Sequence, residues 1–275
     1  MAPALKELSL LLSKKHHVTV VAPTENCSGF SSAITIKKTV KLVQVDTASY
    51  LPTTENRTNL RVFKVEGTPV DCAYLGLHSI FKSCPPDIVI SGINQGENLA
   101  EDTIYSGTVA GAMEAFIFGV PGIAVSQQLS DKHITDFSIS AKIFEQIFEK
   151  IISIQKGSYD NLYLFNVNIP AFRGYADIPS EVEATRLGRR ERAKPPSEIK
   201  NSQIKGVKEF LIGTHGDSPL FPDHGTDLLA IKEKKISVTP LTVDMSCQKS
   251  LSNVGGSFEE IRFSQHLMNG IDNDK

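Results

Sequence analysis

The residues best suited to chemistry are Ser106, Gly107 and Thr108, which stand immediately before a run of small, helix-compatible residues. A helix start presents unpaired backbone N–H groups and the positive end of the helix dipole. Gly107 would let an anion approach the backbone closely, and the neighbouring hydroxyls would add hydrogen-bond donors. The segment therefore predicts a phosphate-binding site, although a serine in this position often serves only as a helix cap.

Two asparagines and a second serine could extend this site. Asn94 and Asn98 lie in a glycine-bearing loop after an apolar run, and Ser28 precedes Gly29 in another loop. Amide oxygens are hard ligands suited to Mg²⁺ or Mn²⁺, and amide N–H groups can stabilise charge on a phosphoryl group. The alternative for each loop is a turn built from Asn, Ser and Gly, without any function.

Other enzyme classes are disfavoured by missing motifs. The sequence contains no G-x-x-x-x-G-K-[ST] loop, no G-x-S-x-G elbow and no G-x-G-x-x-G after a predicted strand. The four cysteines form no C-x-x-C pair, which favours a reduced, cytoplasmic chain over a disulfide or zinc framework. A cluster of histidines and aspartates could suggest a metal site, but its spacing matches no ligand motif, so it predicts a solvated polar loop. Its members are His215, Asp217, Asp223, His224 and Asp227.

Alternating short apolar runs and helical patterns predict an α/β fold. Strands are expected at 18–22, within 34–45, and at 60–65, 87–91, 122–126, 161–166, 183–185, 210–212 and 237–240. Helices are expected from Pro3 onward and at 69–81, 106–118, 137–154 and 258–268, with residues 46–60 as a surface excursion. This order predicts a mainly parallel sheet covered on both faces, with a functional site at its carboxyl edge.

The pattern changes after Pro170, so we expect a core in residues 1–170 and an extension or arm in residues 171–275. The chain opens with a helix that no strand precedes. In doubly wound folds the first strand usually lies centrally. Either a strand has been lost or the fold begins with a helix, and the pattern alone gives both interpretations equal weight.

Composition limits the partners. The 275 residues are 40% hydrophobic with a net charge of −2, which is typical of a globular protein and gives no case for binding nucleic-acid polymers or membranes. No apolar run approaches the roughly 20 residues that span a bilayer, and no signal peptide is recognised. An arginine-rich run could steer anionic substrates or form a solvated loop: Arg186, Arg189, Arg190 and Arg192.

Several segments together resemble the SurE family. The resemblance covers roughly residues 2–245, and its most specific part is the stretch from Pro86 to Glu114. The matching segments are Ala22–Gly29 (A-P-x-x-x-x-S-G), Gly67–Cys72 (G-T-P-x-D-C), Pro86–Asn98 (ending S-G-I-N-x-G-x-N), Tyr105–Glu114 (beginning Y-S-G-T-V), Gly225–Asp227 and Ile236–Leu241.

The resemblance implies a Rossmann-like core and an arm exchanged between subunits of a homodimer or homotetramer. It implies a divalent-metal-dependent phosphatase acting on nucleoside 5′- and 3′-monophosphates, with polyphosphate as a side substrate. Ser28 and Asn94 correspond to two of the family's metal ligands, for Mg²⁺ or Mn²⁺. Ser106, Gly107 and Thr108 correspond to its phosphate site, and Asn98, Ser106 and Thr108 to its catalytic residues.

One departure affects the chemistry. The family's N-D-D-G loop, with two aspartate ligands, stands immediately before a segment that here is Ala2-Pro3-Ala4, directly after Met1. The first strand and the aspartate pair are therefore expected to be missing, through truncation or in a natural short form. A serine and an amide supply no formal charge, so we expect weak metal binding, hydrolysis far below family rates and two unpaired strand edges.

Two functions outside catalysis compete with the phosphatase. The first is a nucleotide- or phosphate-binding protein that keeps the helix-start site without the metal. The second is a structural subunit within an oligomer of complete partners. The preferred nucleotide, the metal and the number of subunits do not follow from the sequence.

Overall fold

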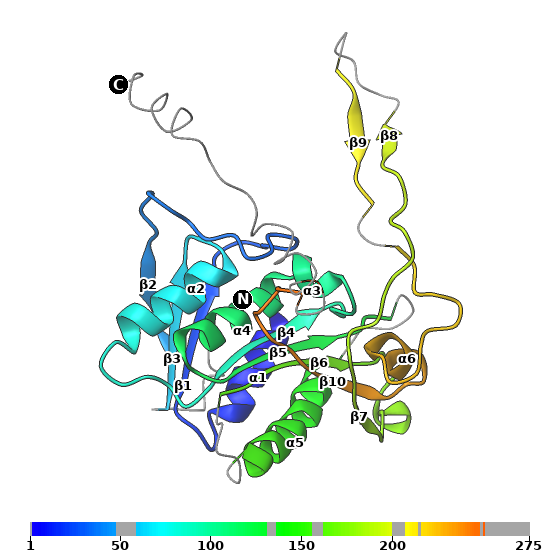
Figure 1. Ribbon diagram of the computed structural model, residues 1–275. Coiled ribbons are helices and arrows are strands. Elements are labelled where there is room, and N and C mark those ends of the chain that lie inside the picture. The colour runs from blue at the N-terminus through cyan, green and yellow to red at the C-terminus, as the bar shows by residue number, and fades with distance from the viewer. Residues whose placement is uncertain are drawn as a thin grey trace, which may run out of the picture. The chain divides into compact units, whose positions relative to one another are not determined.

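The computed structural model describes residues 2–47, 59–130, 136–155, 162–199, 207–213, 216–247 and 250 (Figure 1). The chain divides into two compact units, Met1–Leu241 and Thr242–Lys275, and every element below lies in the first. The strands are β1 (Val18–Pro23), β2 (Leu42–Val45), β3 (Leu60–Val65), β4 (Val89–Gln95), β5 (Gly122–Gln127), β6 (Leu164–Ile169), β7 (Val182–Ala184), β8 (Ser197–Ile199), β9 (Glu209–Leu211) and β10 (Ile236–Pro240). The α-helices are α1 (Pro3–Leu12), α2 (Pro69–Leu75), α3 (Asp102–Tyr105), α4 (Gly107–Phe118), α5 (Phe137–Gln155) and α6 (Asp227–Lys232).

The main sheet has the strand order β4-β5-β6-β10-β7. β4, β5 and β6 are parallel, β10 runs antiparallel to β6, and β7 is parallel to β10. All six residues of β5 are buried, as expected for a central parallel strand. The predicted mainly parallel α/β sheet is confirmed, and strands from beyond residue 170 complete it.

A second sheet stands apart from the first. It has the order β1-β3-β2, with β1 parallel and β2 antiparallel to β3. No described strand pairs with the other edge of β1, nor with the edge of β4 that faces away from β5. The two unpaired edges that the sequence predicted are therefore those of β1 and β4.

Helices cover both faces of the main sheet (Figure 1). On one face, α1 and α5 pack together through residues at helical spacing, including Leu8, Leu12, Phe144 and Phe148. On the other face, α4 approaches the sheet closely because its buried residues are small. A Cβ at Gly122 of β5 would lie 2.3 Å from the Ala112 carbonyl oxygen, so only glycine fits there. Among the described helices, none combines the length and apolarity needed to cross a bilayer.

Some boundaries differ from the sequence prediction. β6 begins and ends three residues later than expected, and it continues through Asn168, which is fully buried although polar. Of the segment 34–45, only Leu42–Val45 forms a strand, since Thr35 is held by hydrogen bonds from its backbone and hydroxyl to Asp71. The helix predicted at 69–81 changes to a π-helical turn at Gly76–Ile80.

The short elements α3, α6 and β8 were not predicted. Each is only three to six residues long, too short for periodicity to reveal. The predicted helix at 258–268 and most of the surface excursion at 46–60 lie outside the described residues.

Candidate active site

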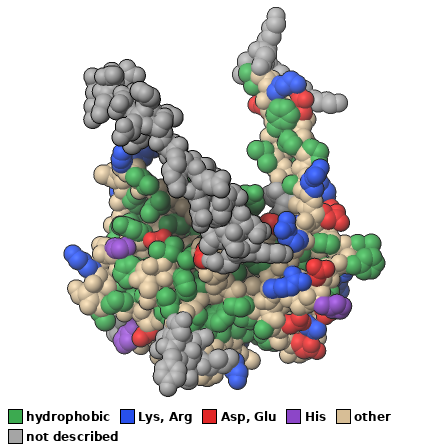
Figure 2. Space-filling view, in the orientation of Figure 1, with side chains coloured by type: hydrophobic (Ala, Val, Ile, Leu, Met, Phe, Trp, Pro, Cys, Tyr) green, Lys and Arg blue, Asp and Glu red, His purple; other side chains and the backbone are tan. Residues whose placement is uncertain are grey.

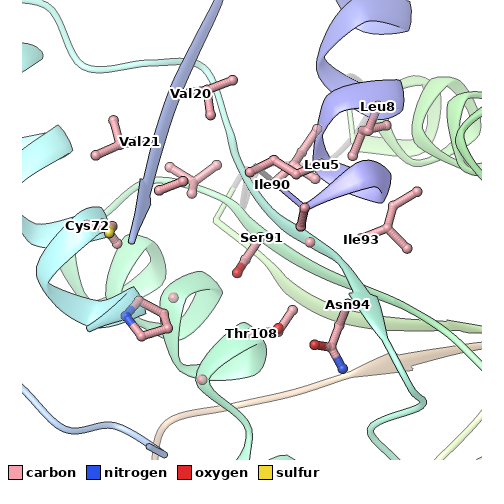
Figure 3. Close-up of a pocket in the computed structure, with 18 of the residues that line it drawn as sticks. Leu5, Leu8, Val20, Val21, Cys72, Ile90, Ser91, Ile93, Asn94 and Thr108 are labelled. Carbon is pink, nitrogen blue, oxygen red and sulfur yellow. The ribbon is translucent and has the colours of Figure 1, made fainter. Parts of the chain in front are cut away.

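A large cavity opens between β1 and β4, with a volume of about 2230 Å³ (Figure 3). We call it the inter-strand cavity; strands β1 and β4 flank it, and α1, α2 and α4 contribute to its walls. Every candidate residue predicted from the sequence lines it: Ser28, Asn94, Asn98, Ser106, Gly107 and Thr108. The fold thus brings together three loops that are far apart in the sequence, at the carboxyl ends of β1 and β4.

The start of α4 contributes three of the candidate residues and is fixed by a helix cap. Ser106 is the N-cap, and its Oγ accepts a hydrogen bond from the Val109 N–H at 3.1 Å. This bond uses a lone pair of the hydroxyl, so its hydrogen stays available to a ligand. A Cβ at Gly107 would lie 2.9 Å from Pro69 Cγ, so the helix start packs directly on α2. Capping and anion binding are therefore compatible at Ser106.

A capping box fixes the start of α2 beneath this helix. Thr68 Oγ1 accepts from the Asp71 N–H, and Asp71 Oδ2 accepts from the Thr68 N–H at 2.9 Å. Asp71 also accepts two hydrogen bonds from Thr35, at 2.8 and 2.7 Å. The G-T-P-x-D-C segment thus has a structural role, because it ties the loop after β1 to α2, the helix on which the start of α4 packs.

This network makes stability depend on pH. Burial alone would raise the pKa of Asp71, but hydrogen bonds from Thr35 and Thr68 outweigh it and leave the pKa below its ordinary value of 3.8. The Asp71 carboxylate therefore binds a proton more tightly in the unfolded chain than in the folded one. Its ionised form stabilises the folded state above pH 3.8, and this contribution is lost as the pH falls through the folded pKa. We expect Asp71→Asn to lose stability at pH 6 and to differ less from the parent at pH 3, measured by urea unfolding; a constant difference would contradict this.

The side chains of the two predicted metal-ligand residues make hydrogen bonds within their own loops. Ser28 is exposed, and both its N–H and its Oγ donate to Asn26 Oδ1, at 3.0 and 2.8 Å. Asn94 donates from Nδ2 to the Gly96 carbonyl at 2.7 Å, which leaves its amide oxygen as the atom for a ligand. Both residues are positioned near the start of α4, but neither carries charge.

Asn98 is held by buried asparagines of β6 that the sequence reasoning missed. Its N–H donates to Asn168 Oδ1 at 2.8 Å, and its carbonyl accepts from Asn166 and Asn168. Its side-chain amide donates to Ser126 Oγ at 2.7 Å. The signal was the alternation of asparagine with valine and isoleucine in Asn166-Val-Asn-Ile169, which places both amides on one face of the strand.

Two charged residues expected to be solvated are buried instead. The Arg190 guanidinium pairs with the Asp102 carboxylate, and the two side chains are 8% and 9% exposed. Asp227 is fully buried and accepts N–H groups from Ala100 and Gly188, and burial raises its pKa despite these bonds. Both groups join the loop that carries Asn98 to the segment containing Arg190.

The remaining arginines match the solvated alternative. Arg186 forms an ion pair with Asp223, and Arg189 forms one with Glu101. The two arginine side chains are 60% and 90% exposed, respectively. Figure 2 shows basic and acidic side chains interspersed at the foot of the β8–β9 arm, without a uniformly basic patch on that face. Exposed ion pairs of this kind contribute little to stability. Because a carboxylate offsets each arginine charge, the pairs also produce little positive potential that could attract an anionic substrate.

The described lining offers neither a cluster of metal-binding side chains nor, at Cys72, a reactive thiol. No group of three or more His, Cys, Asp or Glu side chains suited to a metal occurs among the described residues. Four carboxylates line the cavity: Glu25, Asp87, Glu97 and Asp102. Asp102 pairs with Arg190, and Glu97 accepts a hydrogen bond from Gln128 at 3.2 Å. Burial raises the pKa of the Cys72 thiol to about 12, so this residue stays protonated and is a poor nucleophile.

Comparison with known proteins identifies the family. The model of the survival protein SurE family matches residues 1–194. A 5′-nucleotidase SurE from Pseudoalteromonas atlantica is 38% identical over 253 residues, covering 92% of each chain, and one from Legionella pneumophila is 34% identical over 265 residues, covering 95% of this chain and 94% of that protein. The crystal structure of a SurE protein from Aquifex aeolicus aligns with a TM-score of 0.74 at 31% identity, covering 94% of this chain and 96% of that one. The chain therefore belongs to the SurE family.

Proposed function

We propose that this protein is a nucleotidase that hydrolyses nucleoside 5′- and 3′-monophosphates in the cytoplasm, and that this chain turns over slowly. The observation that carries the proposal is the start of α4, where Ser106, Gly107 and Thr108 line a cavity at the carboxyl ends of two strands. A phosphate at this helix start would receive backbone N–H groups and two hydroxyls. The curated relatives named 5′-nucleotidase supply the substrate class.

The residues around the phosphate have distinct roles in this proposal. Ser106 and Thr108 donate hydrogen bonds to phosphate oxygens, and Gly107 gives the anion access to the backbone. Asn98, whose backbone is fixed to β6 and whose amide is anchored to Ser126, stabilises the charge that develops on the phosphoryl group. Polyphosphate would bind the same donors as a side substrate.

Divalent metal dependence is part of the proposal, but the described donor set does not fit a complete site. Ser28 and Asn94 offer two neutral oxygens, whereas Mg²⁺ and Mn²⁺ bind through one or more carboxylates. The sequence contains no adjacent pair of aspartates anywhere in its 275 residues. We therefore assign no step of the reaction to a metal held by these residues alone, and we expect its affinity to be low.

The same donor set favours a second candidate function. A cavity with a helix-start anion site can bind a nucleotide without cleaving it, because the binding donors need no metal. Metal-independent binding of a nucleoside monophosphate, without phosphate release, would support this alternative over the enzyme.

The assembly expected from the sequence is a homodimer or homotetramer formed through the arm. The β8–β9 hairpin and the residue after it expose large apolar side chains, and exposed apolar patches often mark a protein–protein contact. These side chains are Ile199, Phe210, Leu211 and Ile212. Sedimentation of the purified protein would measure the number of subunits.

Phosphate release tests the proposed activity. We would compare this chain with a version extended by a strand ending in Asn-Asp-Asp-Gly, each with UMP and Mn²⁺. We expect turnover by the extended protein to exceed that of the 275-residue chain by roughly 10³-fold, because a properly ligated metal contributes several kcal/mol of transition-state stabilisation. Equal activity would show that other carboxylates complete the site, and inactivity of both would favour the binding protein.

A further inference from the structure

Two asparagines of β6, Asn166 and Asn168, occupy positions where apolar residues would be expected. Their side chains are fully buried, although asparagine is depleted in strands and a buried amide is destabilising unless it is hydrogen-bonded. Both side chains donate to one atom, the Asn98 carbonyl oxygen, at 2.8 and 3.1 Å. Their residue type is therefore explained by the loop residue that they hold.

Asn166 shows this most clearly. Its Oδ1 is buried and meets no hydrogen-bond donor in the described part of the chain. An unsatisfied buried acceptor destabilises a fold, and a leucine of similar size would avoid that penalty. The hydrogen bond to Asn98 is made in spite of the penalty, as is common where a residue serves a site rather than the core.

Asn168 holds the backbone of Asn98 at two points. Its Oδ1 accepts from the Asn98 N–H at 2.8 Å, while its Nδ2 donates to the Asn98 carbonyl. The N–H and the carbonyl lie on either side of the Cα atom, and hydrogen bonds are directional. Holding both groups therefore fixes the direction in which the Asn98 side chain leaves the backbone.

Ser126 of β5 determines which end of the Asn98 amide faces inward. Ser126 is fully buried, and its Oγ accepts a hydrogen bond from Asn98 Nδ2 at 2.7 Å. An amide nitrogen carries two hydrogens, so the second remains for a ligand in the cavity, which Asn98 lines together with Ser106 and Thr108. Without Ser126 the amide could turn over and present its oxygen, which would repel a phosphate oxygen.

We propose that Asn168 and Ser126 are positioning residues for the reaction, because they hold the Asn98 side chain with its second amide hydrogen turned toward the phosphate site. Both are fully buried, so neither meets the substrate. The inference rests on the proposed function, in which Asn98 stabilises the charge that develops on the phosphoryl group. It predicts an effect on turnover rather than on binding, since the start of α4 holds the phosphate through its own donors.

Two buried serines allow a matched comparison. Ser140 of α5 is as fully buried as Ser126, and its Oγ donates to the side-chain oxygen of Gln127 at 2.9 Å. Gln127 follows Ser126 along β5, so its side chain points to the opposite face of the sheet. Replacing either serine with alanine removes one hydroxyl and one buried hydrogen bond to an amide side chain, but only one of these amides belongs to Asn98.

The two serine variants should differ in kcat. We expect Ser126→Ala to lower kcat for phosphate release from UMP with Mn²⁺ by about tenfold and to leave KM within about twofold of the parent value. Ser140→Ala should leave both constants within about twofold, while the Tm falls to a similar extent in both variants. Equal kcat values for the two variants would overturn the inference, because a general loss of stability affects both alike.

A second pair of variants tests Asn168. Asn168→Leu removes both hydrogen bonds to Asn98 with a side chain of similar size, and it should lower kcat by about tenfold or more. Its control is Thr185→Val, which removes the buried hydrogen bond of 2.7 Å between Thr185 and Thr239 in the same sheet and changes no hydrogen bond of Asn98. A leucine variant that folds and keeps the kcat of this control would overturn the inference for Asn168. Should it fail to fold, the serine pair still decides the question.

The NMR signals of the Asn98 side-chain amide give a readout that needs no turnover. Inorganic phosphate should shift these signals in the parent and in Ser140→Ala, and it should shift them less in Ser126→Ala. A parent that releases no phosphate from UMP would refute the proposed function, while the amide signals would still test the position of Asn98. Equal shifts in the two serine variants, or no shift in the parent, would overturn the inference.

Discussion

Replacing Asp102 with alanine should destabilise the protein by about 3–5 kcal/mol, because it leaves the buried Arg190 guanidinium without its counter-charge. Arg190 donates from Nε to both carboxylate oxygens, at 3.2 and 3.0 Å, and neither side chain is more than 9% exposed. Asp102 begins α3, which leads directly into Ser106. The loss should therefore be accompanied by weaker phosphate binding, and urea unfolding with calorimetric titration would measure both.

Two further variants identify the cause. Asp223→Ala breaks the exposed pair with Arg186 and should cost less than about 1 kcal/mol. Combining Asp102→Ala with Arg190→Met removes the uncompensated charge and should recover most of the lost stability. A single Asp102→Ala variant as stable as the parent would show that Arg190 finds another acceptor, and a double variant as weak as the single would point to packing around α3 instead.

The elements that the sequence predicted well are those whose own burial creates the pattern. β5 is apolar because both of its faces are covered, and α5 repeats its buried positions Phe144, Ile147, Phe148 and Ile151 at helical spacing. The motif residues of the site were also predicted, and the structure gathers Ser28, Asn94 and Ser106 around one cavity. Local pattern therefore suffices for the layers, and the short motifs suffice to predict which loops meet at one cavity.

The residues that hold the site in place were missed because their partners are distant in the sequence. In the sequence, polar Asn168 resembles the end of a strand. Its burial is explained only by Asn98, 70 positions away, whose backbone N–H donates a hydrogen bond to its side-chain oxygen. Arg190 belongs to a run that is otherwise exposed, and only the position of Asp102 explains its burial. Asp227 similarly holds the Ala100 N–H across 127 positions. Residue type indicates polarity, but only tertiary contacts determine whether a polar group is buried.

Replacing Ser106 with aspartate should separate capping from ligand binding at the start of α4. Aspartate caps helices as well as serine, so the free energy of unfolding should stay within about 0.5 kcal/mol of the parent value. The new carboxylate would face a phosphate at hydrogen-bond range, and repulsion there should weaken UMP binding by roughly 10²–10³-fold. Calorimetric titration with UMP, beside urea unfolding, measures the two quantities independently.

The matched variants Ser106→Asn and Ser106→Ala make the interpretation specific. Asparagine keeps the cap and the size of aspartate without its charge, so it should bind UMP far better than the aspartate variant. Alanine loses the hydrogen bond from Val109 and should cost about 1 kcal/mol of stability while weakening binding only about fivefold. The aspartate variant would then be the more stable of the two but the weaker binder of UMP, and the alanine variant would be the less stable but the tighter binder. If aspartate bound UMP as tightly as serine, Ser106 would be a cap alone, and the phosphate would have to bind away from the start of α4.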